Sequence, residues 1–303
     1  MIEKIFLETS IQIRRIWGLP DERIKIGANL RNSDQIYTSS YCFAEYNRTI
    51  LQDLKCLLEI VESNSKDNET IRFADLFYQI KKTQEEERIH LTQRRFERLL
   101  QIGAAFFLGS NRAIYHRDEF LVYLKLLISS EGIRMFFCVE VVAPNGAGNL
   151  EIQIKPVQYI EKIKCDLIPS DTKSPGQKEN HKVCERLSCN RETAECNLKD
   201  FVKQHEAKFS KMEANLRSEL KNIEKSKGKN NPTYRHFKVI EEVFDDLRNP
   251  GGNYNLSKIH GQKNCWRLGD FLIVLEAYKI APIYTKDKIY KVICEPGELY
   301  SEE

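Results

Sequence analysis

The 303-residue sequence contains no apolar run long enough to cross a membrane as a helix, which takes about 20 consecutive apolar residues. Its first ten residues, MIEKIFLETS, lack the basic region and the small-residue cleavage site of a secretory signal peptide. These two absences predict a protein that does not associate with membranes and is located in the cytoplasm.

Several motifs that would indicate a known enzyme class are also missing. The stretch PNGAGN at residues 144–149 contains glycines but no following Lys-Ser or Lys-Thr pair, so it is not a phosphate-binding P-loop. The sequence has no nucleophile elbow, no dinucleotide fingerprint and no internal repeat. Any chemistry must therefore come from side chains that are far apart in the sequence.

The charge balance leaves the partner class open. The chain has 47 basic and 44 acidic residues, for a net charge of +3, which neither requires nor excludes nucleic acid. Nine cysteines are present, and Cys42, Cys56, Cys138 and Cys294 lie among apolar residues. In a cytoplasmic chain, such cysteines are expected to be small buried residues and not disulfides.

The apolar periodicity predicts strands and helices in alternation. The polar segment SNSKDNET at residues 63–70 is expected to be a linker. Residues 133–143 fit either a strand or a helix. The predicted strands are 4–7, 150–160 and 282–284, and the predicted helices are 41–62, within 71–108, 118–130, 198–226, 234–249 and one beginning near residue 269.

Four acidic residues stand at comparable places in this pattern. Glu8 and Asp287 each follow a predicted strand, Glu45 lies near the start of a helix, and Asp270 opens an apolar helix. In α/β folds, ligands gather beyond the carboxyl ends of parallel strands and at the starts of the following helices. Each acid alone also fits an ordinary role, as a solvated residue, a first-turn helix acid or a turn residue.

Four carboxylates at one edge would repel one another unless a cation compensates them. Hard divalent cations with oxygen ligands, Mg²⁺ or Mn²⁺, are the usual solution. Such ions activate water and stabilise the displacement at a phosphodiester. The acidic set therefore favours a metal-dependent phosphodiesterase.

Three stretches of the sequence resemble the motifs of PIN-domain nucleases. They are IFLETSIQI, YTSSYCFAEYNRTI and GDFLIVLEAYKIAPIYTKDK, and together they span about the first 60 and the last 40 residues. The resemblance implies that Glu8, Glu45, Asp270 and Asp287 are the Mg²⁺ or Mn²⁺ ligands. It also implies that Thr9, Ser10 and Thr285 are hydroxyl residues that orient those ligands.

The sequence departs from the family pattern in two ways. The family usually has Asp at the first position, where this chain has Glu8, whose carboxylate lies one methylene further out. The separation of Glu45 from Asp270 is also much longer than in minimal members.

The predicted fold is accordingly α/β, a small PIN-like parallel sheet flanked by helices. Its core halves are residues 1–62 and 261–303, around a mainly helical insertion at 63–260.

The predicted insertion carries a cluster of possible zinc ligands. His181, Cys184, Cys189 and Cys196 are separated by two, four and six intervening residues within a loop-rich segment. Four such ligands can hold a structural Zn²⁺ in a knuckle at 181–196, and His205 is a weaker substitute ligand. Because the spacing is not a paired CxxC pattern, the alternative is three free thiols and a surface histidine.

The predicted insertion also contains basic residues that could follow a phosphate backbone toward the acids. The alternative is a solvated helix face with interspersed glutamates. These residues are Arg88, Arg94, Arg95 and Arg98, followed later by Lys208, Lys211, Arg217, Lys221, Lys225, Lys227 and Lys229.

The sequence therefore predicts a metal-dependent endonuclease that hydrolyses phosphodiester bonds, with RNA favoured over DNA. The alternative is a catalytically weak PIN-like binding module that acts through its helical insertion on a protein or nucleic-acid partner. A third possibility is an α/β scaffold whose acids all lie on the surface. Whether the four carboxylates converge distinguishes these hypotheses.

Overall fold

The computed structural model describes residues 2–64, 69–85, 93–109, 112–142, 151–164, 196–259 and 262–300. Its centre is a five-stranded sheet in the order β5-β6-β2-β1-β7. Strands β6, β2, β1 and β7 are parallel, and β5 pairs antiparallel with β6. The α/β prediction, with a small parallel sheet flanked by helices, is confirmed.

The first half of the chain alternates strands and helices before it forms a helical lobe. Its elements are β1 (Ile2–Leu7), α1 (Thr9–Trp17), α2 (Pro20–Arg31), β2 (Ser33–Ser39), α3 (Ser40–Tyr46), a π-helical turn (Asn47–Leu51), α4 (Gln52–Asn64), β3 (Thr70–Arg72), α5 (Phe73–Glu85), α6 (Gln93–Gly109), β4 (Ile114–His116), α7 (Arg117–Phe136), β5 (Phe137–Val142) and β6 (Glu151–Ile160). Strands β3 and β4 form a separate two-stranded sheet.

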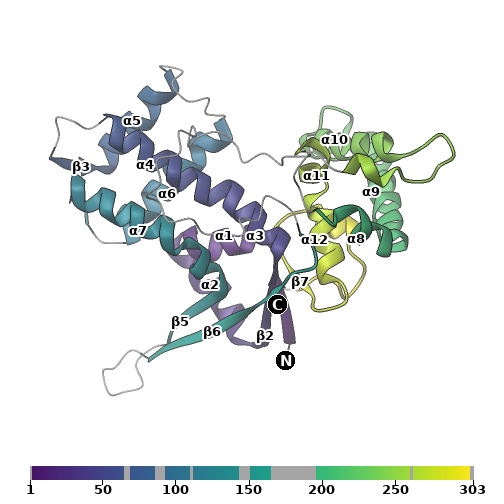
Figure 1. Ribbon diagram of the computed structural model, residues 1–303, viewed down its shortest axis with the longest axis horizontal. Helices are drawn as coiled ribbons and strands as arrows, with labels where there is room; N and C mark the ends of the chain where they lie inside the picture. Colours follow the sequence, from purple (N-terminus) through teal and green to yellow (C-terminus); the bar gives the residue numbers. More distant parts are fainter. Residues whose placement is uncertain are drawn as a thin grey trace.

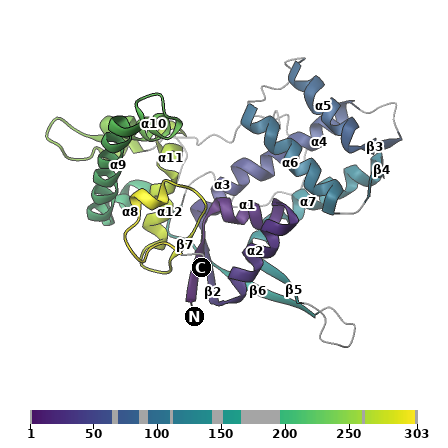
Figure 2. The same ribbon diagram turned by 180° about the vertical axis from the view of Figure 1, so that it is seen from behind.

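The second half is mainly helical and ends with the last strand of the sheet. Its elements are α8 (Leu198–Gln204), α9 (Glu206–Lys227), α10 (Pro232–Leu247), a 3₁₀ turn (Leu256–Ile259), α11 (Gln262–Arg267), α12 (Gly269–Ala277), β7 (Ile283–Tyr284) and α13 (Tyr290–Ile293). Figure 1 shows two groups of helices on opposite sides of the sheet, α4–α7 on the left and α8–α11 on the right. The view from behind in Figure 2 shows the same separation.

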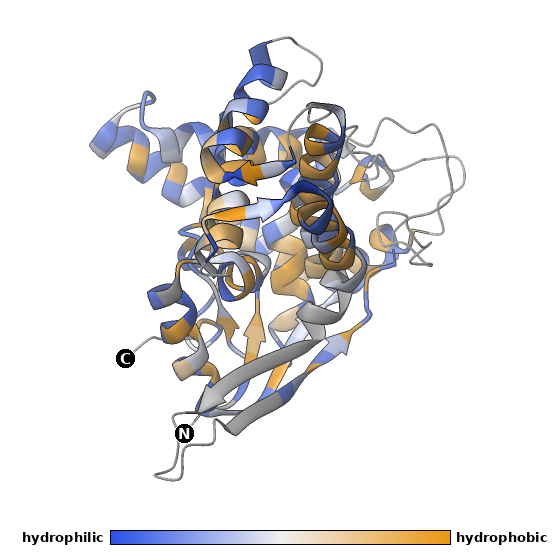
Figure 3. Ribbon diagram, turned by 90° about the vertical axis from the view of Figure 1, so that its left-hand side faces the viewer, coloured by the Kyte–Doolittle hydropathy of each residue, from blue (hydrophilic) through white to orange (hydrophobic). Residues whose placement is uncertain are grey.

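Strand β1 lies between β2 and β7, and apolar side chains bury both of its faces. Ile5 and Leu7 pack with residues of α1 and α2, whereas Phe6 points to the opposite face and joins the core formed by α8–α13. Because successive side chains of a strand point to opposite faces, a strand buried on both sides is a continuous apolar run. Figure 3 shows hydrophobic residues on the inner strands and hydrophilic residues on the outer helices.

The structure also shows how the predicted insertion relates to the sheet. Strand β6, from the middle of residues 63–260, pairs in parallel with β2, for example Ile36 with Val157. Helices α9 and α10 share one hydrophobic core with α12 and β7, through residues such as Phe244 and Phe271. In contrast, α4–α7 have their own hydrophobic cluster.

The individual element predictions can be compared with the structure. The predicted strands at 4–7, 150–160 and 282–284 correspond to β1, β6 and β7, and the helix expected near residue 269 begins there. The helix expected at 198–226 is divided between α8 and α9 at His205. Residues 133–143, which fitted either state, end α7 and form β5. Among the helices with described residues, none combines the length and apolar composition that crossing a membrane requires.

Candidate active site at the carboxyl edge of the sheet

Glu8 lies where β1 ends and α1 begins, and it is 5% exposed. Its side chain caps α1, because Oε1 accepts a 2.8 Å hydrogen bond from the Ser10 backbone N–H. Oε2 accepts hydrogen bonds from the hydroxyls of Ser10 and of Thr285, the latter at 3.1 Å. Glu8 is therefore fixed by one neighbour in sequence and by one residue from the far end of the chain.

Glu45 lies at the same edge, on α3, the helix that follows β2. The hydroxyl of the buried Thr9 donates a 2.7 Å hydrogen bond to Glu45 Oε2. The other oxygen, Oε1, lies so close to Gly269 that a Cβ at that position would be 2.5 Å away. The glycine thus allows α12 to approach α3 at the point where Glu45 lies.

Asp270 occupies the first turn of α12, directly after Gly269. Tyr290, which is fully buried on α13, lies beside Asp270. The Tyr290 hydroxyl has no hydrogen-bond partner of normal distance and angle among the described residues.

Asp287 follows β7 and is the exposed member of the set. Its backbone N–H donates a 3.0 Å hydrogen bond to the Thr285 hydroxyl, which in turn bonds to Glu8. Its carboxylate Oδ1 accepts from the Ile289 backbone N–H at 3.3 Å. The loop Thr285–Ile289 is therefore folded around Asp287 and tied back to Glu8.

Burial and mutual charge raise the pKa of three of these acids. Burial raises the pKa of Glu45 to about 7, and the charges of Glu8 and Asp287 add to this while Thr9 and Arg48 oppose it. Burial raises the pKa of Asp270 well above its usual value, and the other three acids contribute further. Burial also raises the pKa of Glu8 despite its hydrogen bonds. The four acids therefore interact electrostatically, as expected for a convergent set.

A bound cation requires more than this proximity. Within the part of the chain that the structure describes, no group of three Asp, Glu, His or Cys side chains is positioned to hold a metal ion. The chemistry of the donor set fits a hard cation, because every member is a carboxylate. The carboxylates of Glu8 and Glu45 accept hydrogen bonds from the hydroxyls of Ser10, Thr285 and Thr9.

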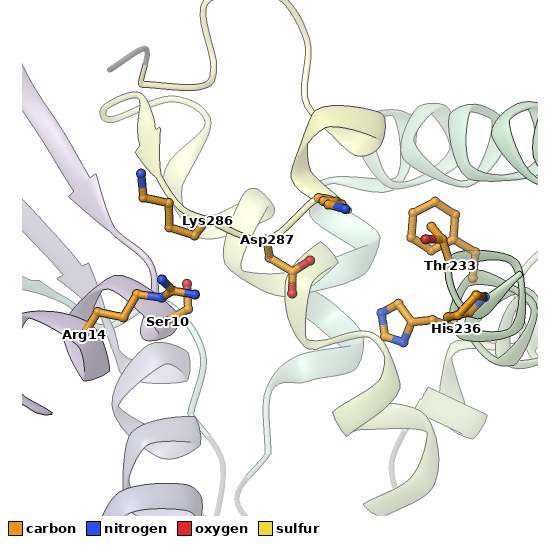
Figure 4. Close-up of a pocket in the computed structure, with 9 residues that line it drawn as sticks. Ser10, Arg14, Thr233, His236, Lys286 and Asp287 are labelled. Atoms are coloured by element: carbon orange, nitrogen blue, oxygen red, sulfur yellow. The ribbon is translucent and has the colours of Figure 1, made fainter. Parts of the chain in front are cut away.

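A pocket opens beside the acids, with a volume of about 460 Å³. Ser10 and Arg14 of α1 line one side, and Lys286, Asp287 and Lys288 line the floor. The N-terminal part of α10 forms the opposite side. In Figure 4, Asp287 lies between the Arg14 side and the His236 side of this pocket.

A cationic side chain that the sequence analysis did not single out, Arg48, lies beside Glu45. Arg48 lies one turn further along the helix, and its guanidinium carbon is 3.7 Å from the centroid of the Trp266 ring. Its charge lowers the pKa of Glu45. Arg48 belongs to the π-helical turn Asn47–Leu51, a conformation that is frequent at functional sites.

Most of the basic residues predicted to follow a phosphate backbone are engaged in ion pairs. Arg95 and Arg98 bond to the buried Asp53 at 2.8 and 2.6 Å. Lys208 pairs with Glu295 and Glu298. The other pairs are Lys211 with Glu295, Arg217 with Glu213, Glu241 and Asp245, and Lys229 with Glu224. The exposed Lys211 and Lys229 fit the alternative of a solvated helix face with interspersed acids. Arg95 and Lys208 are instead buried in their ion pairs. Arg88 lies outside the described residues.

The zinc prediction falls mostly on residues that are not described. His181, Cys184 and Cys189 lie outside the described residues. Cys196 is half-buried and packs against the core that contains α8 and α12. His205, the substitute ligand, lies close to the Tyr278 hydroxyl, with 3.0 Å between Nδ1 and the oxygen. The zinc knuckle stays a prediction.

Comparisons with known proteins identified no relative of this chain. No family model matches the chain, and no curated protein or solved structure matches it at a significant level.

Proposed function

We propose that the protein is a PIN-like, metal-dependent phosphodiesterase that cleaves RNA. The observation that carries the proposal is the position of Glu8, Glu45, Asp270 and Asp287. Glu8 and Asp287 follow two parallel strands, whereas Glu45 lies on α3 and Asp270 in the first turn of α12. Burial, and then the charges of neighbouring acids of the set, raise the pKa values of Glu8, Glu45 and Asp270. Ligand sites in parallel α/β sheets form at this edge.

The proposed ligand residues are the same four acids, and the proposed cation is Mg²⁺ or Mn²⁺. When bound, such a cation neutralises the carboxylates, activates water and stabilises the leaving oxygen of a phosphodiester. The chain's own hydroxyls hold the carboxylates: Thr9 bonds to Glu45, and Ser10 and Thr285 bond to Glu8. Such outer hydrogen bonds orient metal ligands and are expected to affect metal affinity.

The neighbouring pocket supports an anionic substrate. Its lining includes Arg14, Lys286 and Lys288, and Asp287 is the acid that it shares with the candidate site. A cationic surface beside a carboxylate-held metal suits a phosphodiester, whose backbone is negatively charged. RNA is the first candidate substrate because of the sequence resemblance described above.

The experiment compares the wild-type protein with Asp270→Asn and with a matched control, Asp246→Asn. Asp246 is exposed on α10 and does not line the pocket beside the acids. Each protein is incubated with end-labelled single-stranded RNA or DNA and with Mn²⁺, Mg²⁺ or EDTA. We expect metal-dependent cleavage by the wild type and by Asp246→Asn, and a loss of at least 100-fold in Asp270→Asn. Equal cleavage by all three proteins would assign the activity to another site or to a contaminant.

One observation favours the second candidate, a binding module with little or no catalysis. Glu8 acts as a helix cap, and no three described acids are positioned together around an ion site. In this case the protein binds nucleic acid or a protein through its helical segments without cleaving. A calorimetric titration with Mn²⁺ distinguishes the two functions. The metal-dependent enzyme should bind Mn²⁺, whereas the binding module should not bind it at millimolar concentration.

A further inference from the structure

The pocket beside Asp287 has features that the four acids do not explain. It is formed by two parts of the chain, the sheet edge with α1 and the N-terminal part of α10. Its volume of about 460 Å³ lies within the range of roughly 300–1,000 Å³ that is typical of small-ligand sites. A pocket of this size takes one residue of a polymer at a time.

The charges of the lining residues select an anion. Arg14, Lys286 and Lys288 are cationic at neutral pH, and Asp287 is the single carboxylate among the lining residues. Arg14 also forms an ion pair with Glu22, and the Arg14 side chain is 43% exposed. Lys286 and Lys288 are exposed, and they stand on either side of Asp287 in the chain. Their positions place cationic side chains next to any phosphate that reaches Asp287.

The opposite side of the pocket is held in place by the core. Phe237 is 2% exposed, and it anchors the first turns of α10 together with the buried Ile240 and Phe244. Arg217 on α9 bonds to Glu241 and Asp245 on α10, which fixes the helix further. Thr233 and His236 therefore present a hydroxyl and an aromatic ring from a rigid position, as Figure 4 shows.

We infer that this pocket binds a single nucleic-acid strand at the residue next to the phosphodiester that is cut. Lys286, Lys288 and Arg14 contact a backbone phosphate, and His236 provides the ring on which the adjoining base or sugar packs. The inference rests on the proposed function for its position relative to the cut bond. Binding itself requires no metal and no cleavage.

The test measures strand binding without catalysis. A fluorescein-labelled 12-nucleotide oligouridine is titrated in EDTA, and its anisotropy is followed between 50 and 200 mM salt. The test variants are Lys286→Ala/Lys288→Ala and His236→Ala, all at exposed positions. The matched control is Lys81→Ala/Lys82→Ala, which removes the same charge from exposed positions on α5.

We expect the pocket lysine variant to bind at least 10-fold more weakly. Its salt dependence should also fall by about 1.4 in slope, because two single-strand phosphate contacts are lost. His236→Ala should weaken binding several-fold without changing the slope, and the α5 control should stay within 2-fold of the wild type. Equal weakening in the α5 control and the pocket variant, or none in either, would overturn the assignment.

The result is separable from the cleavage assay. A wild-type protein that binds the strand through Lys286 and Lys288 but cleaves nothing supports the pocket and contradicts the proposed hydrolysis. A wild-type protein that cleaves RNA, while the pocket lysine variant binds like the wild type, supports the hydrolysis and contradicts the pocket. Circular dichroism of each variant checks that the fold is intact.

Discussion

The hydroxyl of Thr9 donates a 2.7 Å hydrogen bond to Oε2 of Glu45, so the first turn of α1 is joined to α3 at the candidate site. The bond joins the helices that follow β1 and β2, which are neighbouring strands. It also lowers the pKa of Glu45 against the effect of burial. Thr9 therefore favours the ionised form of a carboxylate that its surroundings would keep protonated.

Replacing Thr9 with Val tests this bond while keeping the size of the side chain. The unfolding free energy should fall by about 1–3 kcal/mol, because a partly buried acceptor loses its donor. The affinity for Mn²⁺ should fall by about 10-fold, as is typical when a residue that orients a metal ligand is removed. Chemical denaturation and calorimetry measure the two effects. Thr70→Val, at an exposed position on β3, is the control and should change neither.

Gly269→Ala should displace Glu45. The added Cβ would lie 2.5 Å from Glu45 Oε1 and 3.2 Å from the Tyr41 ring, so the carboxylate must move. We expect the RNA cleavage rate to fall at least 10-fold while the protein remains folded. Gly27→Ala is the matched control, because its Cβ would meet nothing within 4 Å on helix α2. It should keep full activity and gain about 0.5–1 kcal/mol of stability. Wild-type cleavage by Gly269→Ala would contradict the position assigned to Glu45.

Glu276 makes stability depend on pH. It is fully buried, and Oε1 accepts from the Ser40 hydroxyl and the Ile163 N–H while Oε2 has no partner among the described residues. Burial raises its pKa to about 8, from an ordinary value of 4.5. The native state thus favours the protonated form. Its contribution is fully present below about pH 4.5, falls as the pH rises toward 8, and is constant above that.

Glu276→Gln should remove this dependence. The amide keeps an acceptor for Ser40 and Ile163 but cannot ionise. The variant's stability relative to the wild type should therefore increase between pH 5 and 8, by at most about 1.4 kcal/mol per pH unit. Urea unfolding at pH 5, 6, 7, 8 and 9 measures this. Glu161→Gln, at an exposed position, should run parallel to the wild type. Parallel curves for Glu276→Gln as well would show that Glu276 ionises normally.

The ion pairs of Asp53 should contribute to the stability of the fold and not to nucleic-acid binding. Asp53 and Arg95 are 1% and 8% exposed, so Asp53→Ala leaves a buried guanidinium without its partner. We expect a loss of about 3–5 kcal/mol in unfolding free energy. The exposed Asp118→Ala is the control and should cost less than about 0.5 kcal/mol. The affinity of Arg98→Ala for oligouridine should stay within 2-fold of the wild type. A larger loss of affinity would show that Arg98 contributes to nucleic-acid binding.

Strands β1 and β7 and helix α12 were predictable because each contains an uninterrupted apolar stretch, at residues 5–7, 283–284 and 271–275. Strand β2 was not predicted. Its sequence, SDQIYTS, is mostly polar, yet it lies between β1 and β6. Its place depends on pairing with strands on both sides and on Thr38, whose hydroxyl donates to the Leu7 carbonyl oxygen at 3.2 Å. Such long-range pairing is not visible in local periodicity.

The candidate site was predictable in its residues more than in its contacts. The sequence indicated Glu8, but not that its carboxylate caps α1 and therefore has a second, structural role. The sequence suggested Arg95 and Arg98 as contacts for a phosphate backbone, because nothing local indicates that Asp53 lies against them. The sequence did not indicate His236, because its position in the pocket with Asp287 depends on how α10 packs on the core.

The pairing of β7 with β1 sets an order of events during synthesis. Leu7 is synthesised long before its partner Tyr284, and the Thr285 hydroxyl can reach Glu8 only once Tyr284 has been made. Before residue 270 is synthesised, the chain carries Glu8 and Glu45 but neither Asp270 nor Asp287. The proposed four-acid site therefore cannot assemble on a nascent chain that lacks these later residues.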